Sequence, residues 1–500
     1  MLKRLLVFVC LISILPFGSA LCDCDPVRVI NGEADEDHFG MAVAGIDDVD
    51  DDGVGDFLVG AFTNDAAEDD AGRVYLYSGV DGYLIRTFSG HGVNEEFGYA
   101  VADAGDVDSD GYPDIAVGAP TSEVEGPALG KVYVYSGQNG ALLYEFDGER
   151  HQDQFGISVA GAGDVNNDGF DDVIVGAIFY DNDADSAAGR AYVFSGADGA
   201  TLLVFDGEDK YNRFGFAVAG AGDINRDGYD DVIVGAPYNS ANGNKAGRAY
   251  VFSGVDGSKL YHFTGLTSDG YHGYAVTGVG DVNKDGYPDV MVGAPYVYSR
   301  NGRVYVYSGL DGSVLYTFYG NDQERLGRAV ADIGDMNHDG YPDLAMSSNG
   351  NDLLVGKVYI YSGKDGELLN KILGDIKDNQ FGLSIGAISN VDPEGNLDLV
   401  VGIPWQSTAG YRRGQAQVYH AWVPCVCCEG FTGNVDCSEL DSPDIADITR
   451  LIDYLYLSHA PLCCPEEADT DGNFGEPDIS DITRIINFLY LGGMPPVFCP

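Results

Sequence analysis

The chain has 500 residues, enough for several domains or one large repeat architecture, and its 79 acidic residues against 27 Lys and Arg give a formal net charge of −52. This charge disfavours nucleic acid and anionic membranes as partners, and its self-repulsion opposes folding unless cations are bound. The 70 glycines and 45% hydrophobic residues indicate tight turns between short strands and argue against disorder.

Residues 1–20 have the pattern of a secretory signal peptide, with a basic pair at 3–4, an apolar run over 5–15 and small residues at 18–20. The apolar run is too short for a good membrane anchor. Cys22 leaves a bacterial lipoprotein open as an alternative, although the residue before it fits a lipidation site badly. We therefore expect a secreted, extracellular protein, either free or associated with a cell surface, without a membrane span.

A nine-residue acidic loop recurs along the chain. In Asp106–Asp114, carboxylates stand at positions one, three, five and nine, and Gly111 stands at position six. Ca²⁺ takes six to eight oxygen ligands, so alternate side chains of a tight loop can converge on it, while the glycine lets the backbone fold back. Mg²⁺ is disfavoured because it seldom uses an all-protein oxygen cage. Copies at a near-constant spacing begin at Asp48, Asp106, Asp164, Asp223, Asp281, Asp335 and, in degraded form, Asn390.

The first six loops predict six Ca²⁺ sites, one in each repeat. We favour a structural role for this Ca²⁺, in which it stabilises its repeat, over a role in Ca²⁺ sensing or in bridging to a ligand. Their ligands would be Asp48, Asp50, Asp52 and Asp56; Asp106, Asp108, Asp110 and Asp114; Asp164, Asn166, Asp168 and Asp172; Asp223, Asn225, Asp227 and Asp231; Asp281, Asn283, Asp285 and Asp289; Asp335, Asn337, Asp339 and Asp343. The seventh loop keeps the spacing with Asn390, Asp392, Glu394 and Asp398, but its altered residues set it apart.

Each repeat predicts four short antiparallel strands. In the second repeat these are Phe97–Val101, which leads into the acidic loop, then buried Asp114–Ala119, alternating Lys131–Tyr135 and, after a turn, Leu142–Phe146. Four strands per unit, repeated seven times, predict an all-β seven-bladed β-propeller over residues 21–424.

Two short elements in these repeats resemble the FG-GAP repeats of integrin α-subunit propellers. Phe-Gly occurs at Phe39, Phe97, Phe155, Phe214 and Phe381, and is replaced by His272-Gly273 and Leu326-Gly327; Gly-Ala-Pro is intact at Ala119-Pro120, Ala236-Pro237 and Ala294-Pro295. The resemblance covers about residues 27 to 423. It implies blades around a central axis with the metal loops on one face.

The strand order predicts two unlike faces. The acidic loops and the turns between third and fourth strands share one end of the blades, while loops of variable length share the other, as binding surfaces tend to do. Aromatic residues expected on this variable face are Phe62, Phe179, Tyr180, Tyr238, Tyr296, Tyr298, Trp405 and Tyr411. Their rings could stack on sugars or contact a protein, although for any one of them loop packing is the better explanation.

The ring should close through the N-terminus. The seventh repeat lacks its last strand, and Val27–Ile30 matches the missing strand, so it should complete the seventh blade and remove an open edge. Cys22 and Cys24 would lie on one side of the resulting chain break and Cys425, Cys427 and Cys428 on the other, which predicts a disulfide across it. Export favours disulfides over zinc, and nine cysteines after cleavage leave one unpaired.

Residues 425–500 contain a duplicated unit, an acidic loop followed by an amphipathic helix that begins at Asp447 and again at Asp481. The pair is similar to a dockerin module, a small α-helical family that binds two Ca²⁺ through EF-hand-type loops and docks to a cohesin domain. The ligands this resemblance implies are Asn434, Asp436, Ser438 and Asp447, then Asp469, Asp471, Asn473 and Asp481. The first loop lacks the glycine and contains Cys437, so one or two Ca²⁺ are expected.

Six basic residues follow a glycine at the start of the third strand, and a repeated ion pair explains them better than a ligand clamp; they are Arg73, Lys131, Arg190, Arg248, Arg303 and Lys357. No nucleophile elbow, phosphate-binding loop or histidine metal motif is present.

The sequence therefore favours a non-catalytic, secreted, calcium-binding adhesion or recognition protein. Its propeller would bind an extracellular protein or glycan, and its dockerin-like tail a cohesin-type partner. The alternatives are a dockerin-bearing polysaccharide-degrading enzyme, a glycoside hydrolase or lyase, and a purely structural surface-layer component. A hydrolase needs two carboxyl groups about 5 to 9.5 Å apart and free of metal.

Overall fold

The computed structural model describes residues 26–420 apart from 123–128, 182–185, 350–354, 375, 378, 390–396 and 408–409. These residues fall within one compact unit that spans residues 23–424. The expected signal peptide, the cysteines, the disulfide, most of the seventh acidic loop and the dockerin-like module lie outside the described residues.

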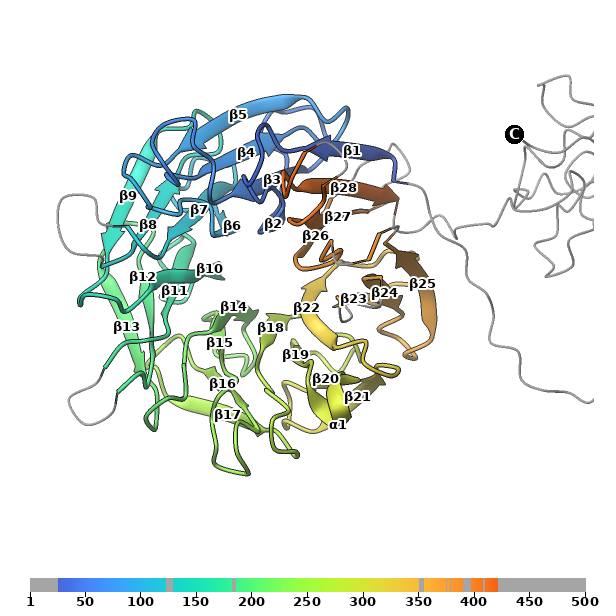
Figure 1. The fold of residues 1–500 in the computed structure, drawn as a ribbon. Coiled ribbons are helices and arrows are strands. Elements are labelled where there is room, and N and C mark those ends of the chain that lie inside the picture. The colour runs from blue at the N-terminus through green and yellow to red at the C-terminus, as the bar shows by residue number, and fades with distance from the viewer. Residues whose placement is uncertain are drawn as a thin grey trace, which may run out of the picture. The chain divides into compact units, whose positions relative to one another are not determined.

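Seven four-stranded antiparallel sheets surround a central axis, as Figure 1 shows, so the predicted seven-bladed β-propeller is confirmed. Blade 1 contains β2 (Val43–Ile46), β3 (Asp56–Ala61), β4 (Arg73–Tyr77) and β5 (Leu84–Ser89); blade 2 contains β6 (Ala100–Gly105), β7 (Asp114–Ala119), β8 (Lys131–Tyr135) and β9 (Leu142–Asp147). Blade 3 contains β10 (Phe155–Gly163), β11 (Asp172–Ala177), β12 (Arg190–Phe194) and β13 (Thr201–Asp206); blade 4 contains β14 (Ala217–Gly222), β15 (Asp231–Ala236), β16 (Arg248–Phe252) and β17 (Lys259–Thr264).

The remaining blades keep the same order. Blade 5 contains β18 (Ala275–Gly278), β19 (Val290–Ala294), β20 (Arg303–Tyr307) and β21 (Val314–Tyr319); blade 6 contains β22 (Leu326–Asp332), β23 (Leu344–Ser348), β24 (Lys357–Tyr361) and β25 (Leu368–Leu373). Blade 7 contains β26 (Ile385–Ile388), β27 (Asp398–Ile403), β28 (Gln415–His420) and β1 (Arg28–Asn31). The short α1 (Val297–Arg300) has left-handed dihedrals at Tyr298 and Ser299, so it is a tight turn and not a regular helix.

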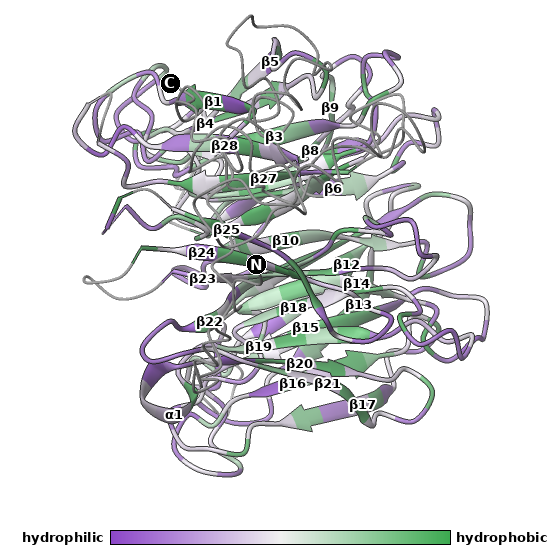
Figure 2. Cartoon of the chain, turned by 90° about the vertical axis from the view of Figure 1, so that its right-hand side faces the viewer, coloured by the Kyte–Doolittle hydropathy of each residue, from purple (hydrophilic) through white to green (hydrophobic). Residues whose placement is uncertain are grey.

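The hydrophobic core lies between neighbouring blades. Every residue of second strands such as β7 and β11 is buried, because blades pack on both faces of each sheet. One core cluster joins Val132 and Val134 of blade 2 to Val173 and Val175 of blade 3. Figure 2 shows the outcome from the side, with apolar strands between hydrophilic loops.

The Phe-Gly elements lie between the blades. Phe97 is fully buried, its ring centroid lies 5.4 Å from that of Tyr133, and its backbone forms only an isolated bridge with Gly72. The expected strand Phe97–Val101 starts too early, because the pairing of this segment with β7 begins at Ala100, after the left-handed Gly98 (φ +89°). In blade 3 the equivalent strand, β10, does begin at its phenylalanine, Phe155. His272 replaces phenylalanine in blade 5, where burial lowers its pKa to about 3 and keeps the imidazole neutral.

The predicted closure by the N-terminus is confirmed. β1 pairs antiparallel with β28 as the outermost strand of blade 7, with Arg28 opposite Val418 and Asn31 opposite Gln415. Ile30 packs against the core cluster that blades 1 and 7 share, whereas Val29 is exposed. The closing strand therefore offers two apolar side chains in opposite environments.

We predict that Ile30→Ser destabilises the propeller by about 1–2 kcal/mol, because it removes apolar contacts at the closing strand. Val29→Ser is the matched control and should change stability by less than about 0.5 kcal/mol. Urea unfolding followed by tryptophan fluorescence measures both values. Equal effects of the two variants would contradict the closure.

Candidate calcium loops and the variable face

The acidic loops and the turns between third and fourth strands lie together, as predicted, and a buried aspartate joins them. Asp114, at position nine of its loop, accepts hydrogen bonds from the backbone N–H of Val107 (2.8 Å) within the loop and of Gly137 (3.1 Å) in the turn. The Asp114 side chain is fully buried. Its carboxylate thus connects the two hairpins of the blade at one end.

The position-one carboxylate shapes the loop itself. Asp106 accepts hydrogen bonds from the backbone N–H of Asp110 (2.9 Å) and Gly111 (2.9 Å), and Asp110 accepts one from Tyr112 (3.0 Å). These bonds hold the loop in a tight turn that faces alternate side chains toward one point. Positive φ at Gly111 is required there.

The same five hydrogen bonds recur in all six loops predicted to bind Ca²⁺, at nearly the same distances. The position-nine acceptors are Asp56, Asp114, Asp172, Asp231, Asp289 and Asp343, and the position-one acceptors are Asp48, Asp106, Asp164, Asp223, Asp281 and Asp335. The six loops therefore share one hydrogen-bonded structure.

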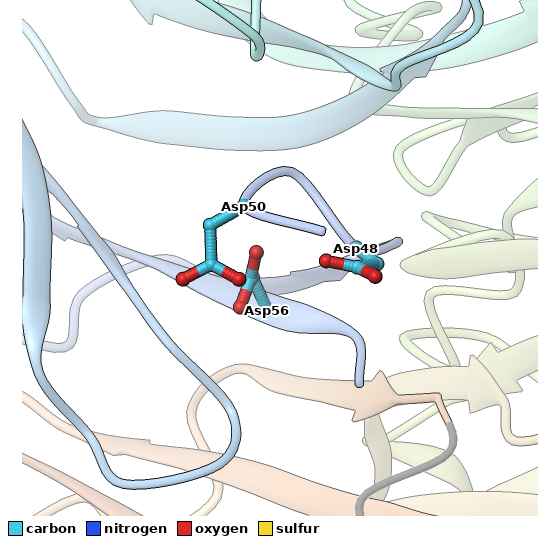
Figure 3. A group of neighbouring side chains, drawn as sticks. All are labelled: Asp48, Asp50 and Asp56. Carbon is cyan, nitrogen blue, oxygen red and sulfur yellow. The ribbon is translucent and has the colours of Figure 1, made fainter. Parts of the chain in front are cut away.

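Carboxylate oxygens converge in the first two loops. Asp48, Asp50 and Asp56 each offer an oxygen within 4.8 Å of the others, and Asp106, Asp108 and Asp114 do the same. Figure 3 draws the three side chains of the first loop. In the other four loops Asn166, Asn225, Asn283 and Asn337 occupy position three and offer an amide oxygen instead. An oxygen-only set of this kind fits a hard cation such as Ca²⁺.

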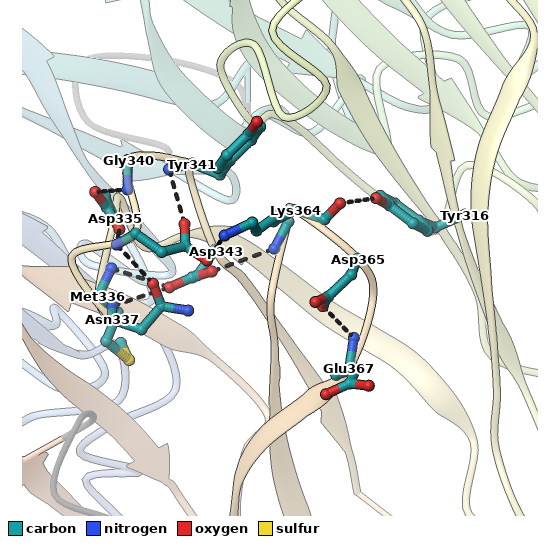
Figure 4. Close-up of polar contacts among 12 residues, drawn as sticks. Tyr316, Asp335, Met336, Asn337, Gly340, Tyr341, Asp343, Lys364, Asp365 and Glu367 are labelled. Carbon is teal, nitrogen blue, oxygen red and sulfur yellow. Dashed lines mark hydrogen bonds and ion pairs between the residues drawn. The ribbon is translucent and has the colours of Figure 1, made fainter.

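The sixth loop adds a basic side chain to this arrangement. Lys364 Nζ lies 3.7 Å from Asp339 Oδ2, beside the usual bonds to Asp335 and Asp343 (Figure 4). A bound cation would compete with this lysine for Asp339, so the sixth loop has the weakest case for Ca²⁺ among the described loops. The predicted ligand Asp398 of the seventh loop is fully buried and accepts a hydrogen bond from His420 (2.8 Å), while residues 390–396 lie outside the described part of the chain.

Burial is the largest influence on the position-nine carboxyl groups. It raises the pKa of Asp56, Asp114, Asp172, Asp231 and Asp289 to about 7 and that of Asp343 to about 6, whereas the backbone N–H donors act in the opposite direction. A bound divalent cation would favour the charged form of each group.

Sequence reasoning missed the contact between neighbouring loops. Asp171, at position eight, accepts a hydrogen bond from the backbone N–H of Asp106 in the preceding blade (2.8 Å), and Asp230 does the same for Asp164 (3.1 Å). Pro113, Pro288 and Pro342 stand at this position in other loops. Position eight is aspartate or proline in the second to sixth loops and Gly55 in the first, and this bias was the available signal.

The basic residues at the start of the third strand form the expected ion pairs in five of six cases. Arg73 pairs with Glu33 (3.0 Å), Arg190 with Asp206 (2.7 Å), Arg248 with Glu208 (2.7 Å), and Lys131 and Lys357 with Glu145 and Glu324. Arg303 is the exception, because its guanidinium stacks on the rings of Tyr298 (4.3 Å) and Tyr319 (4.7 Å). The five pairs join the third strand to the fourth, as with Glu145 and Asp206, or to a loop before the blade, as with Glu33, Glu208 and Glu324.

The variable face, the end of the propeller opposite the acidic loops, has a repeated backbone feature. The residue before each Phe-Gly element or its replacement has a left-handed φ between 51° and 61°. These seven residues differ widely in chemistry; they are His38, Glu96, Gln154, Arg213, Tyr271, Arg325 and Gln380. Of the aromatic residues expected on this face, Tyr298, Trp405 and Tyr411 are exposed, whereas Tyr180 is buried beneath Arg190.

A cleft of about 680 Å³ opens on this face over blades 2 and 3, lined by Glu96, Thr121, Asp153, Phe179 and Asp181 among others. Asp153 is buried, and its Oδ2 has no hydrogen-bond partner among the described residues. Burial raises the pKa of Asp153 to about 6 and also raises that of Glu96. The cleft thus combines an aromatic ring with carboxyl groups that hold a proton more readily than ordinary ones.

Comparisons with known proteins agree with this geometry. Four segments match the FG-GAP repeat family model, at residues 97–135, 155–194, 214–252 and 272–307, which are blades 2 to 5. The chain is 34% identical to integrin alpha-5 of Xenopus laevis over 215 residues, which cover 40% of this chain and 20% of that protein. It is 31% identical to integrin alpha-V of Gallus gallus over 258 residues, covering 49% and 23%, and 36% identical to integrin alpha-IIb of Homo sapiens over 214 residues, covering 40% and 20%.

The chain spans about a fifth of the length of these relatives. Within the described residues, no helix combines the length and apolar character needed to cross a bilayer. The chain thus carries FG-GAP repeats in a seven-bladed β-propeller that is similar in sequence to integrin alpha chains.

We predict that Asp114→Ala lowers the melting temperature by a few degrees and removes about one bound Ca²⁺ per chain, because it deletes a predicted ligand and the bonds between two hairpins. Ser109→Asn is the matched control, because Ser109 lies at position four of the same loop and asparagine tolerates its left-handed φ of 56°. Differential scanning calorimetry and elemental analysis measure both quantities. EDTA should lower the melting temperature of the unaltered protein further, and an unchanged transition in EDTA would contradict structural calcium.

A second prediction concerns pH. In EDTA, the position-nine carboxyl groups have a higher pKa in the folded chain than the ordinary 3.8, so the folded state binds more protons between about pH 4 and pH 7. The contribution of these groups to stability should therefore be greatest below about pH 4 and fall as pH rises through 7. Saturating Ca²⁺ should flatten or reverse this slope in melting temperature. Identical slopes of melting temperature against pH in EDTA and in Ca²⁺ would show that proton binding and Ca²⁺ binding at these loops are not linked.

Proposed function

We propose that this chain is a secreted, non-catalytic recognition or adhesion protein, whose propeller is held together by Ca²⁺ and binds an extracellular protein or glycan on its variable face. The observation that carries the proposal is the division of each blade into a constant end and a variable end. Six loops keep the same hydrogen bonds at one end, while length and chemistry vary at the other. Similarity to integrin alpha chains supports an extracellular recognition or adhesion role.

The Ca²⁺ of this proposal would be bound by the six sets of oxygen ligands predicted from the sequence. Its chemistry is structural: it neutralises clustered carboxylates and fixes the loop end of each blade. We extend the proposal to the C-terminal residues 425–500, where the dockerin-like sequence would bind further Ca²⁺ and dock to a cohesin-type partner. The support for that extension is the duplicated sequence alone.

A second candidate function is a polysaccharide-degrading enzyme, and the cleft over blades 2 and 3 is the observation that favours it. Asp153 and Glu96 lie outside the predicted metal ligands, and both carboxyl groups have a raised pKa, as a general acid requires. Phe179 offers a ring on which a sugar could stack. We rank this function second, because buried carboxyl groups also stand two residues before the Phe-Gly element in blades 1 and 2, at Asp37 and Glu95, which indicates a structural position.

The test is an array of glycans and extracellular proteins, probed with the full chain in Ca²⁺ and in EDTA. We predict binding to a subset of the array in Ca²⁺, and loss of binding in EDTA because the blades loosen. Absence of binding to any glycan, matrix or cell-surface preparation would contradict the proposal.

The same preparations decide between the two functions. Release of reducing ends or unsaturated sugars from a polysaccharide panel, abolished by Asp153→Asn but retained by Ser109→Asn, would replace recognition with catalysis. A chain that binds glycans without cleaving them supports the proposal.

A further inference from the structure

Four basic side chains on the variable face have no acidic partner. Arg213, Lys245, Arg325 and Arg328 form no ion pair and donate no side-chain hydrogen bond to any residue that the structure describes. The Nε atom of Arg325 is buried without a partner among those residues. By contrast, Arg190 is paired with both Glu149 and Asp206. In a chain with a net charge of −52, acidic side chains far outnumber basic ones, so several unpaired basic side chains on one face are unexpected.

Aromatic rings hold these cations in place. The Arg213 guanidinium lies 5.0 Å from the ring centre of Phe179 and 4.0 Å from that of Tyr238. Tyr238 contacts Tyr271 edge to face at 5.1 Å, and Tyr271 lies 5.0 Å from Tyr296. These rings and cations form a continuous row across blades 3, 4 and 5, which we call the aromatic–basic row.

The row continues into blade 6. Arg325 lies 5.7 Å from the ring of Tyr296, which also contacts Tyr274 at 6.1 Å. Arg328 lies 4.5 Å from the ring of Tyr274 and belongs to β22, an innermost strand beside the central axis in Figure 1. Lys245 lies 5.2 Å from Tyr238 and adds a further cation to the row. The row thus runs from the loops of blade 3 to the axis at blade 6.

Every side chain in the row is half-buried, so each is fixed yet reachable. Burial lowers the pKa of the Arg328 guanidinium to about 10, which leaves it charged at neutral pH. A partly desolvated charge gains more from an opposite charge than an exposed one does. A guanidinium stacked on a ring also keeps its N–H groups free in its own plane, where they match a carboxylate in bidentate fashion.

We propose that the aromatic–basic row is the ligand-binding surface of the propeller and that its occupant is a protein segment with exposed Asp and Glu side chains. The inference rests on the proposed function and specifies its ligand.

Charge and composition select this occupant. Arg213, Arg325 and Arg328 present three guanidinium groups that form no ion pair with the described residues, so acidic side chains of a ligand would find them free to pair. Tyrosine and arginine are residue types that dominate protein–protein hot spots, because they combine rigid apolar area with directional hydrogen bonds. Carboxyl groups also lie on this face, among them Glu96 and Asp153 in the cleft that Phe179 lines, but none of the described carboxyl groups forms an ion pair with a cation of the row.

The experiment uses the full chain in Ca²⁺ and fluorescein-labelled Gly-Ser peptides that carry zero, two or four glutamates, followed by fluorescence anisotropy at physiological ionic strength. Affinity should rise with the number of glutamates and weaken as salt increases. A chain with Arg213→Gln, Arg325→Gln and Arg328→Gln should lose at least about tenfold of the affinity for the four-glutamate peptide. Arg226→Gln is the matched control, because Arg226 also stacks on a tyrosine, Tyr287 at 5.2 Å, but lies in an acidic loop.

Three outcomes would overturn the inference: affinity that does not depend on the glutamates, equal losses in the triple variant and Arg226→Gln, or a clear preference for oligogalacturonate of the same charge. The last result would assign the row to an acidic glycan. Calorimetric melting of each variant excludes unfolding as the cause of a loss. If the array detects a ligand whose binding the triple variant retains, the proposed function survives and this inference fails.

Discussion

The architecture depends on one interaction, the buried aspartate that ends each acidic loop. A four-stranded blade consists of two hairpins whose inner strands pair, in blade 2 from Ile115 opposite Tyr135 to Ala119 opposite Lys131. Beyond the end of this ladder, the position-nine carboxylate, Asp114 in blade 2, joins the loop to the turn by accepting N–H groups from both. It is a carboxyl group without solvent contact, whose charged form is costly unless a cation or several donors stabilise it. Both the cost of burying this carboxylate and the stabilisation from its hydrogen bonds recur in blades 1 to 6. The stability of the whole propeller should therefore depend on cation binding.

Much of this arrangement could be predicted because the same sequence pattern recurs in every repeat. A period-two pattern in Lys131–Tyr135 gives the third strand, and the fully buried Asp114–Ala119 has the apolar run of a central strand. Closure by β1 could be inferred from counting strands, since a propeller cannot keep an open edge at low cost. The positions of the predicted ligands in six loops came from spacing alone.

Other features depend on contacts that a repeat pattern does not encode. The start of β6 was misplaced, because the segment pairs with β7 only from Ala100, although the same Phe-Gly segment of blade 3 belongs to β10. The bond from Asp106 to Asp171 joins residues in different blades, so neither sequence neighbourhood suggests it. The same is true of the aromatic–basic row, whose members come from four blades and meet only after the ring has closed.

The seven left-handed residues that precede the Phe-Gly elements separate the backbone conformation from the surface chemistry of each repeat. Their backbone conformation is the same in every blade, yet the side chains range from Glu96 to Arg325 and Tyr271. The next two residues set this conformation, because one packs its side chain between blades and the other is a glycine that has no room for a side chain. Such a position lets mutation alter the surface while the core keeps its packing. The propeller therefore resembles an antibody framework, in which a constant scaffold displays interchangeable residues and new specificities can arise without refolding.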